Sequence, residues 1–303
     1  MSSLEYTPPA AQALQWVLRV AGPDCQVVSV SRLHGGITAA IDLVEIGDAS
    51  SASAQRLVLR RWSANDGRDE RLVARETAAL MAMEDSCVPA PRVVGFDEDG
   101  SEAGVPCTLT TAVPGAPDLA PVDLDDWLRQ LAETQAQIHA VSGKLPDSWD
   151  GFYDADAPLA WLPDAAMREA ARQAAALPSG DRQVAIGHGD YQHFNVLWDS
   201  GRLTGVVDWP NAGMTPRGAD VGHCRLNLAV LFSVAAADDY LAAYERAADV
   251  SVDPAADLRA VLNFDAAWQR FIPIQVHGRA PVDVAGMPGR VTELVRHILA
   301  RIG

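Results

Sequence analysis

The chain has 303 residues, with 24 Lys and Arg against 40 Asp and Glu, so its formal charge is −16. We do not expect so acidic a chain to bind nucleic acid without sequence preference, or an anionic membrane surface, because like charges repel. Hydrophobic residues make up 49% and charged residues 21%, which is typical of a globular protein and argues against long disordered stretches. Composition alone does not decide whether the acidity serves a cationic partner or solubility.

The cysteines and the apolar stretches of the sequence indicate in which cellular compartment the protein is expected. The four cysteines lie far apart and form no Cys-x-x-Cys pair, which argues against a thiolate zinc site or a disulfide framework and favours a reducing compartment. The N-terminus has neither the basic nor the apolar region of a signal peptide. The longest apolar stretch, 226–237, is too short to span a bilayer. We therefore expect a cytoplasmic protein without membrane contact, and no obligate protein partner is evident.

The first third of the chain has the pattern of short strands. Apolar and polar residues alternate there in runs rich in Val, Ile and Leu, and Gly, Ser and Asp separate these runs. This pattern predicts a strand-rich module with one internal helix. The strands are expected over 25–33, 39–46, 55–62, 92–99 and 106–113, and the helix over 69–83.

After Pro114 the composition changes to residues that favour helices. The segment 123–141 begins with acidic residues, which stabilise the N-terminal end of a helix through its dipole. Further helices are expected over 163–176, 218–231, 234–248, 255–270 and 289–302. The change in composition predicts an N-terminal nucleotide-binding lobe over 1–112 and a helical C-terminal lobe over 113–303.

Three oxygen-bearing side chains are expected to converge on one hairpin. Asp190 follows a short apolar strand and a Gly-His-Gly sequence, and Asn195 comes five residues later, directly before a second strand. A turn and a return strand then end at Asp208. Carboxylate and amide oxygens suit Mg²⁺, which also takes substrate phosphates as ligands. A carboxylate that is not on the metal can orient and deprotonate a hydroxyl, so the pattern indicates phosphoryl transfer of the kinase type.

The same residues carry a resemblance to a known family. The segment 188–195, followed by Val206-Val207-Asp208-Trp209, resembles the catalytic core of the aminoglycoside phosphotransferase/choline kinase-like family. Further segments resemble other parts of that family in the same order, so the resemblance extends over roughly residues 25 to 231. These segments are 33–38 for the nucleotide-covering loop, 57–61 for the third strand, 75–80 for the helix with a paired glutamate, 88–93 for the entry to the fourth strand, and 218–229 for the helix after the metal-binding Asp.

The resemblance implies an α+β, bilobal protein-kinase-like fold, with a small antiparallel β lobe and a mainly helical lobe, and with the nucleotide between them. It implies that Asp190 is the catalytic carboxylate and that Asn195 and Asp208 bind Mg²⁺. It further implies that Glu76 pairs with the cation that binds phosphate and that the adenine is bound at a hinge over 110–113. The implied nucleotide-binding residues are Gly35, Gly36, Thr38, Arg60, Glu76, Thr110 and Ala112.

The sequence departs from the family at the phosphate-binding cation. The third strand of a typical kinase presents Lys, whereas this chain has Arg60 and Arg61. Arginine keeps its charge and can bind phosphate with two N–H groups. Alternation along a strand places the two arginines on opposite faces without deciding between them, and the resemblance favours Arg60. The nucleotide loop is also shorter than usual, with only Gly35-Gly36 and with Thr38 as a further candidate for phosphate contact.

Several polar and aromatic residues have a simpler structural interpretation. His188 is expected to bond the backbone of its own loop, and His193 could either brace the loop or contact substrate. Asp220 and Arg225 are expected to brace the helix that contains them. Trp127, Trp268 and Phe271 are expected to be core residues.

The predicted reaction is transfer of the γ-phosphoryl group of ATP (or GTP) to a hydroxyl of a small molecule, with an aminoglycoside antibiotic as one candidate. The alternatives are a metabolic kinase that acts on a sugar, a choline-like compound or an amino alcohol, and a nucleotide-binding module without turnover. The motifs of the α/β-hydrolases, of P-loop enzymes and of dinucleotide-binding Rossmann folds are all absent from the sequence.

Overall fold

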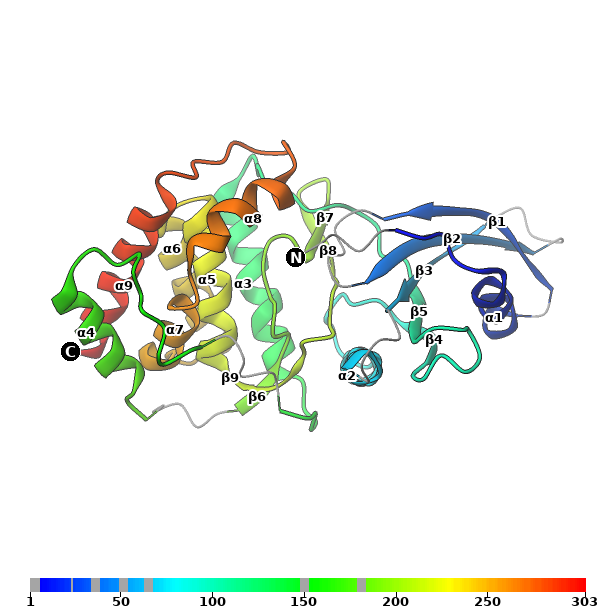
Figure 1. Ribbon diagram of the computed structural model, residues 1–303, viewed down its shortest axis with the longest axis horizontal. Helices are drawn as coiled ribbons and strands as arrows, with labels where there is room; N and C mark the ends of the chain where they lie inside the picture. The colour runs from blue at the N-terminus through cyan, green and yellow to red at the C-terminus, as the bar shows by residue number, and fades with distance from the viewer. Residues whose placement is uncertain are drawn as a thin grey trace. The chain divides into compact units, whose positions relative to one another are not determined.

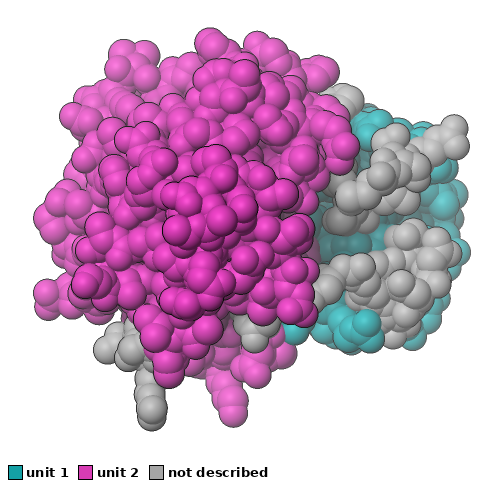
Figure 2. Space-filling model, turned by 60° about the vertical axis from the view of Figure 1, so that its left-hand side comes forward, with its two compact units in different colours: residues 1–85, 90–113 teal, residues 86–89, 114–303 magenta. Residues whose placement is uncertain are grey.

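The computed structural model describes residues 6–22, 24–33, 39–48, 54–62, 68–147, 153–178 and 184–303. The chain divides into two compact units, coloured separately in Figure 2. Unit 1 comprises Met1–Asp85 and Ala90–Val113, and unit 2 comprises Ser86–Pro89 and Pro114–Gly303. Unit 1 is built on an antiparallel sheet and unit 2 is mainly helical, which confirms the predicted α+β class.

Unit 1 contains a five-stranded sheet in which every neighbouring pair is antiparallel, in the order β1-β2-β3-β5-β4 (Figure 1). Four of the strands fall within the segments predicted from alternation. The remaining strand, β2, extends two residues beyond its predicted segment. Their bounds are Cys25–Arg32 for β1, Ala40–Asp48 for β2, Gln55–Arg61 for β3, Val93–Asp97 for β4 and Cys107–Thr111 for β5.

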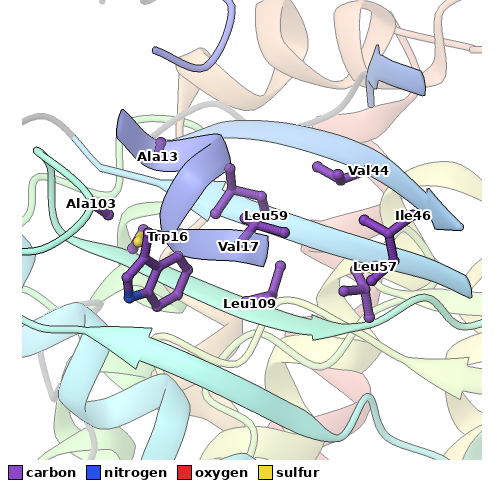
Figure 3. Close-up of a cluster of buried hydrophobic side chains, with 10 residues drawn as sticks. Ala13, Trp16, Val17, Val44, Ile46, Leu57, Leu59, Ala103 and Leu109 are labelled. Carbon is purple, nitrogen blue, oxygen red and sulfur yellow. The ribbon is translucent and has the colours of Figure 1, made fainter. Parts of the chain in front are cut away.

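One face of this sheet packs against the helix α1 (Ala11–Ala21), which the sequence analysis did not predict. Leu57 and Leu59 alternate along β3 toward this side and are fully buried with Trp16 and Val17 of α1 (Figure 3). The apolar residues of α1 recur at helical spacing and form its buried side. Burial of these side chains stabilises unit 1 by about 1.5–3 kcal/mol for each large aliphatic residue.

The opposite face of the sheet packs against α2 (Arg68–Met83). Trp62, directly after β3, lies in a small buried cluster with Val73 of α2 and Ala39. Because side chains alternate along a strand, Arg60 is on the same face as Trp62. The strand therefore directs Arg60 to α2 and Arg61 to the other side.

Unit 2 contains seven helices and two small antiparallel sheets within the described residues (Figure 1). Helix α5 is buried along most of its length and packs against α6, α7 and α9. The helices are α3 (Leu124–Ala140), α4 (Ala165–Ala175), α5 (Arg217–Leu231), α6 (Val234–Ala248), α7 (Pro254–Val261), α8 (Ala266–Val276) and α9 (Met287–Ile302). The sheets pair β6 (Val184–Gly187) with β9 (Gly213–Pro216), and β7 (Val196–Asp199) with β8 (Arg202–Val206).

The single helix predicted over 255–270 is wrong, because the structure has two helices there, α7 and α8. Asp265 begins the second helix, since its carboxylate accepts a hydrogen bond from the N–H of Ala267 at 2.7 Å. The connecting residues Leu262 and Phe264 are buried. The apolar pattern therefore continues through the turn, and the sequence does not indicate that the first helix ends there. Strand β9 was also not predicted. No helix in the described ranges has the length and apolar character needed to cross a bilayer.

Candidate active site

The loop between β6 and β7 brings Asp190 and Asn195 together. The Asn195 amide nitrogen donates to the Asp190 carboxylate Oδ2 at 3.0 Å and to the Asp190 carbonyl oxygen at 2.9 Å. The Gln192 amide nitrogen donates to the other carboxylate oxygen, Oδ1, at 2.7 Å. The Asp190 side chain keeps 23% of its surface exposed, so a hydroxyl group can still reach it.

The hairpin of β7 and β8 places Asp208 next to this loop. The Val207 N–H donates to the carbonyl oxygen of Asn195 at 2.9 Å, so Asp208 is one residue beyond the position that pairs with Asn195. Asp208 has a φ of 72°, a conformation that costs a residue other than glycine about 1–3 kcal/mol. The buried indole of Trp209 donates to the carbonyl oxygen of Val206 at 2.8 Å and stabilises this turn.

Asp220 anchors the backbone of the loop between β6 and β7. Its carboxylate accepts hydrogen bonds from the N–H groups of His188 at 3.1 Å and Gly189 at 2.8 Å. Two side chains of α3, Gln135 and His139, donate to the same carboxylate, each at 3.1 Å. Burial alone would raise the pKa of Asp220, but the hydrogen bond and charge of His139 and the N–H donors hold that pKa well below its ordinary value. The sequence predicted that Asp220 braces its own helix. In the structure it also holds the backbone of the loop.

Gly189 is required by the backbone at this point. Its φ is 77°, and a Cβ atom would collide with the carbonyl oxygen of Asn211. Only glycine adopts this conformation without strain, so the Gly-Asp sequence of the loop has a steric cause.

The two histidines of the loop are structural. His188 is buried, its Nε2 bonds the carbonyl oxygen of Val207 at 3.0 Å, and burial lowers its pKa. The N–H of Asp190 donates to Nδ1 of His188 at 3.3 Å, which is the expected bond to the backbone of its own loop. His193 packs between the rings of Phe194 and Phe232, and burial lowers its pKa to about 3. Neither ring nitrogen of His193 has a hydrogen-bond partner among the described residues, so this side chain is a neutral packing residue.

Sequence reasoning missed His223, which lies on α5. Its Nε2 is 2.8 Å from Oδ1 of Asp190. The only signal in the sequence is its position three residues after Asp220, since residues at this spacing share one face of a helix.

In unit 1 the structure brings Arg60 and Glu76 together. The Arg60 guanidinium donates to the Glu76 carboxylate at 3.0 Å, and the hydroxyl of Thr108 donates to its other oxygen at 2.8 Å. Arg61 instead binds Asp42 on β2, with its shorter contact at 2.8 Å. The two neighbouring arginines thus have different carboxylate partners on opposite faces of the sheet.

The remaining predicted nucleotide-binding residues lie in β5, after it, or outside the described ranges. Thr110 pairs with Val58 of β3 in the sheet. The N–H of Ala112 already donates to the carbonyl oxygen of Arg56 at 3.0 Å, so a nucleotide would have to use another backbone group there. Gly35, Gly36 and Thr38 lie outside the residues that the structure describes.

A family model described as the phosphotransferase enzyme family matches residues 32–271. The chain belongs to this family. That confirms the predicted family and the prediction that the protein is a phosphotransferase. No curated protein sequence matches this chain.

Solved structures share the fold of this phosphotransferase at low sequence identity. A protein of Ralstonia eutropha JMP134, assigned as a candidate aminoglycoside phosphotransferase, has a TM-score of 0.62 and 15% identity, covering 97% of this chain and 99% of that chain. Macrolide 2′-phosphotransferase MphH of Brachybacterium faecium has a TM-score of 0.58 and 18% identity, covering 93% and 98%. A thermostable mutant of aminoglycoside phosphotransferase APH(4)-Ia, in a ternary complex with AMP-PNP and hygromycin B, has a TM-score of 0.55 and 20% identity, covering 95% and 98%.

The oxygen donors at this site are of the chemical kind that binds Mg²⁺. The Asn195 amide nitrogen is bonded to Asp190, so the amide oxygen of Asn195 and the carboxylate of Asp208 are the oxygens that would hold Mg²⁺. Mg²⁺ is usually held by one or two protein oxygens together with substrate phosphates. No group of three or more His, Cys, Asp or Glu that could hold a metal occurs in the described part of the chain.

Proposed function

We propose that this phosphotransferase moves the γ-phosphoryl group of ATP, in the presence of Mg²⁺, to a hydroxyl of a small molecule. The observation that carries the proposal is the hydrogen-bonded pair of Asp190 and Asn195 at the base of the hairpin that ends at Asp208. In this arrangement Asp190 would act on the hydroxyl, and Asn195 and Asp208 would supply the oxygen ligands of the metal. This division of tasks is the one required for phosphoryl transfer of the kinase type.

In the proposed mechanism, Asp190 accepts a hydrogen bond from the acceptor hydroxyl and holds its oxygen in line with the phosphorus. As the new O–P bond forms and the bond to the β-phosphate oxygen breaks, the hydroxyl proton passes to the Asp190 carboxylate. Asn195 and Asp208 would hold Mg²⁺, which when bound neutralises the charge that develops on the phosphates. The rate enhancement then comes mainly from positioning and electrostatics.

Arg60 is the proposed phosphate-binding cation in unit 1. Its guanidinium is largely buried, and Glu76, fixed in turn by Thr108, sets its orientation. Arginine can bind phosphate oxygens through two parallel N–H groups. Because Arg61 is bound to the fully buried Asp42 on the other face, the geometry favours Arg60 for this role.

The acceptor is proposed to be an antibiotic with a free hydroxyl, in the first instance an aminoglycoside. The APH(4)-Ia complex holds hygromycin B, and MphH is a macrolide 2′-phosphotransferase, so the fold accommodates different acceptors. The AMP-PNP in the APH(4)-Ia complex supports ATP rather than GTP as donor. The four free cysteines suit a reducing cytoplasm, which is the proposed location.

The test is release of ADP or GDP from the magnesium nucleotide with a panel of aminoglycosides, macrolides, tuberactinomycins, sugars and amino alcohols. We expect turnover with at least one of them, and a loss of about 1,000-fold or more in Asp190→Asn and Asp208→Asn. His297→Leu is the control, since His297 lies on the surface of α9 and bonds Asp238. Turnover that persists in both Asp variants would contradict the assignment. Nucleotide binding without turnover of any acceptor would favour the non-enzymatic alternative.

A further inference from the structure

Helix α5 holds three successive residues of the catalytic loop through two of its side chains. Asp220 accepts hydrogen bonds from the backbone of His188 and Gly189. One turn later, His223 reaches the side chain of Asp190. The backbone of the loop and its reactive carboxylate are thus oriented by the same rigid element, because residues three apart lie on one face of a helix.

The contact of His223 with Asp190 has the geometry of a charge-assisted hydrogen bond. Nε2 of His223 is 2.8 Å from Oδ1 of Asp190, and since an ionised carboxylate only accepts, Nε2 carries the hydrogen. Burial would lower the pKa of His223, but the hydrogen bond and the charge of Asp190 outweigh it and raise that pKa. The side-chain amide of Asn227 donates to the carbonyl oxygen of His223 at 3.0 Å, and the ring of Trp268 lies 6.4 Å from the imidazole.

The hydrogen bonds on Asp190 distinguish its two carboxylate oxygens. An ionised carboxylate has about four acceptor positions, two on each oxygen. Among the described residues, His223 and Gln192 both donate to Oδ1, whereas only Asn195 donates to Oδ2. The remaining acceptor position is therefore on Oδ2, the oxygen that also faces the amide of the proposed metal ligand.

We propose that His223 is a positioning residue for phosphoryl transfer, which holds Asp190 by Oδ1 so that Oδ2 receives the acceptor hydroxyl. The inference rests on the proposed function, because it assigns His223 a task only if Asp190 acts on a hydroxyl. His223 does not contact the substrate in this scheme. It limits rotation of the carboxylate about the Cβ–Cγ bond, and Gln192 assists from within the loop.

Loss of such a residue affects the rate of transfer and leaves substrate affinity almost unchanged. A carboxylate that rotates freely spends less time in line with the hydroxyl, which lowers kcat. The ground-state contacts to acceptor and nucleotide do not involve His223, so both KM values are retained. Glutamine can present a side-chain N–H close to the position of the histidine Nε2, whereas asparagine is too short to do so.

The test compares His223→Gln, His223→Asn and His223→Leu, with His297→Leu as the control and MgATP as the donor. The acceptor is whichever member of the panel the wild-type enzyme phosphorylates. We expect kcat to fall about 10- to 100-fold in the Asn and Leu variants, with both KM values within about threefold of wild type. The Gln variant is expected to stay within about fivefold. Thermal unfolding shows whether each variant folds, and comparison of Gln with Asn decides the question even if Leu fails to fold.

Equal rates for the Gln and Asn variants would overturn the inference, whether both are normal or both are slow, because the donor at the Nε2 position would then be irrelevant. A higher KM in place of a lower kcat would also overturn it. Asp190→Asn separates this failure from that of the proposed function. If Asp190→Asn is inactive while all His223 variants are normal, only the inference is wrong. If Asp190→Asn retains turnover, or no acceptor is phosphorylated, the proposed function fails and the inference fails with it.

Discussion

The two units each contain a buried carboxylate at the centre of their polar contacts, but the two carboxylates are held differently. In unit 1, Glu76 is bonded by Arg60 and by the hydroxyl of Thr108. In unit 2, Asp220 accepts from two backbone N–H groups of the loop and from Gln135 and His139 of α3. Glu76 thus forms a charged pair between one strand and one helix, while Asp220 joins a loop and two helices.

This difference predicts different tolerance to substitution. A charged pair can be rebuilt with another cation of similar reach, because an ammonium group can also donate an N–H to the Glu76 carboxylate. The contacts of Asp220 cannot be rebuilt by a neutral side chain, because four donors converge on it and two of them belong to the backbone. A buried carboxylate of this kind is costly to replace while its donors remain.

The largest effect is expected for Asp220→Asn. The amide has the same size, but its NH₂ group cannot accept from the donors that now surround the carboxylate. We expect the free energy of unfolding to fall by about 3 kcal/mol or more, and turnover to fall at least 100-fold because the backbone of the loop is released. Urea denaturation and the nucleotide assay measure the two effects. An unfolding free energy within 1 kcal/mol of wild type would show that Asp220 does not hold the loop.

A smaller effect is expected at Arg60. Arg60→Met is expected to raise the KM for MgATP by about 10- to 50-fold, since the proposed phosphate contact is lost. Arg60→Lys should stay within about fivefold of wild type, because an ammonium group keeps the charge beside Glu76. Arg61→Met is the matched control. It leaves the buried Asp42 without its arginine, so it should lower stability and leave the KM for MgATP unchanged. The reverse pattern would assign the phosphate to Arg61.

The pair of His223 and Asp190 predicts how stability depends on pH. The pKa of His223 is raised in the folded protein by its bond to Asp190, although burial opposes this. A raised pKa adds stability that is fully present below the pKa of the unfolded chain and is lost as the pH rises through that of the folded protein. The difference in unfolding free energy between wild type and His223→Gln should therefore be larger at pH 5.5 than at pH 9. A difference that grows with pH would contradict the pair.

The smallest effect is a difference in thiol reactivity, with one buried cysteine in each unit. Burial raises the pKa of Cys107 to about 12 and also raises that of Cys224, whereas Cys87 is exposed. Iodoacetamide at pH 8 should modify Cys87 first, and Cys107 and Cys224 only after unfolding. Mass spectrometry at increasing urea then reports the opening of unit 1 through Cys107 and of unit 2 through Cys224. Rapid modification of either buried thiol in the native protein would contradict the packing described.

The parts of the fold that were predicted correctly depend on local pattern. Alternation along the chain predicted the strands of unit 1, and helical spacing predicted most helices of unit 2. Helix α1 was not predicted. The turn between α7 and α8 was not predicted either, because its residues are buried like those of the helices beside it. Strand β9 was missed because a four-residue strand with little alternation carries almost no signal of its own.

The sequence by itself determined the family, the fold class and the residues proposed for the chemistry, because Asp190, Asn195 and Asp208 lie on one loop and one hairpin. Local geometry brings such residues together whatever the rest of the chain does. The tertiary structure alone decided that Asp220 holds the loop between β6 and β7 and that His223 bonds Asp190. These partners are 31 to 33 residues apart in the sequence. Their contacts depend on how helices pack against strands and loops. The spacing of apolar residues along the chain predicts single helices and strands, but it does not predict how these elements pack together.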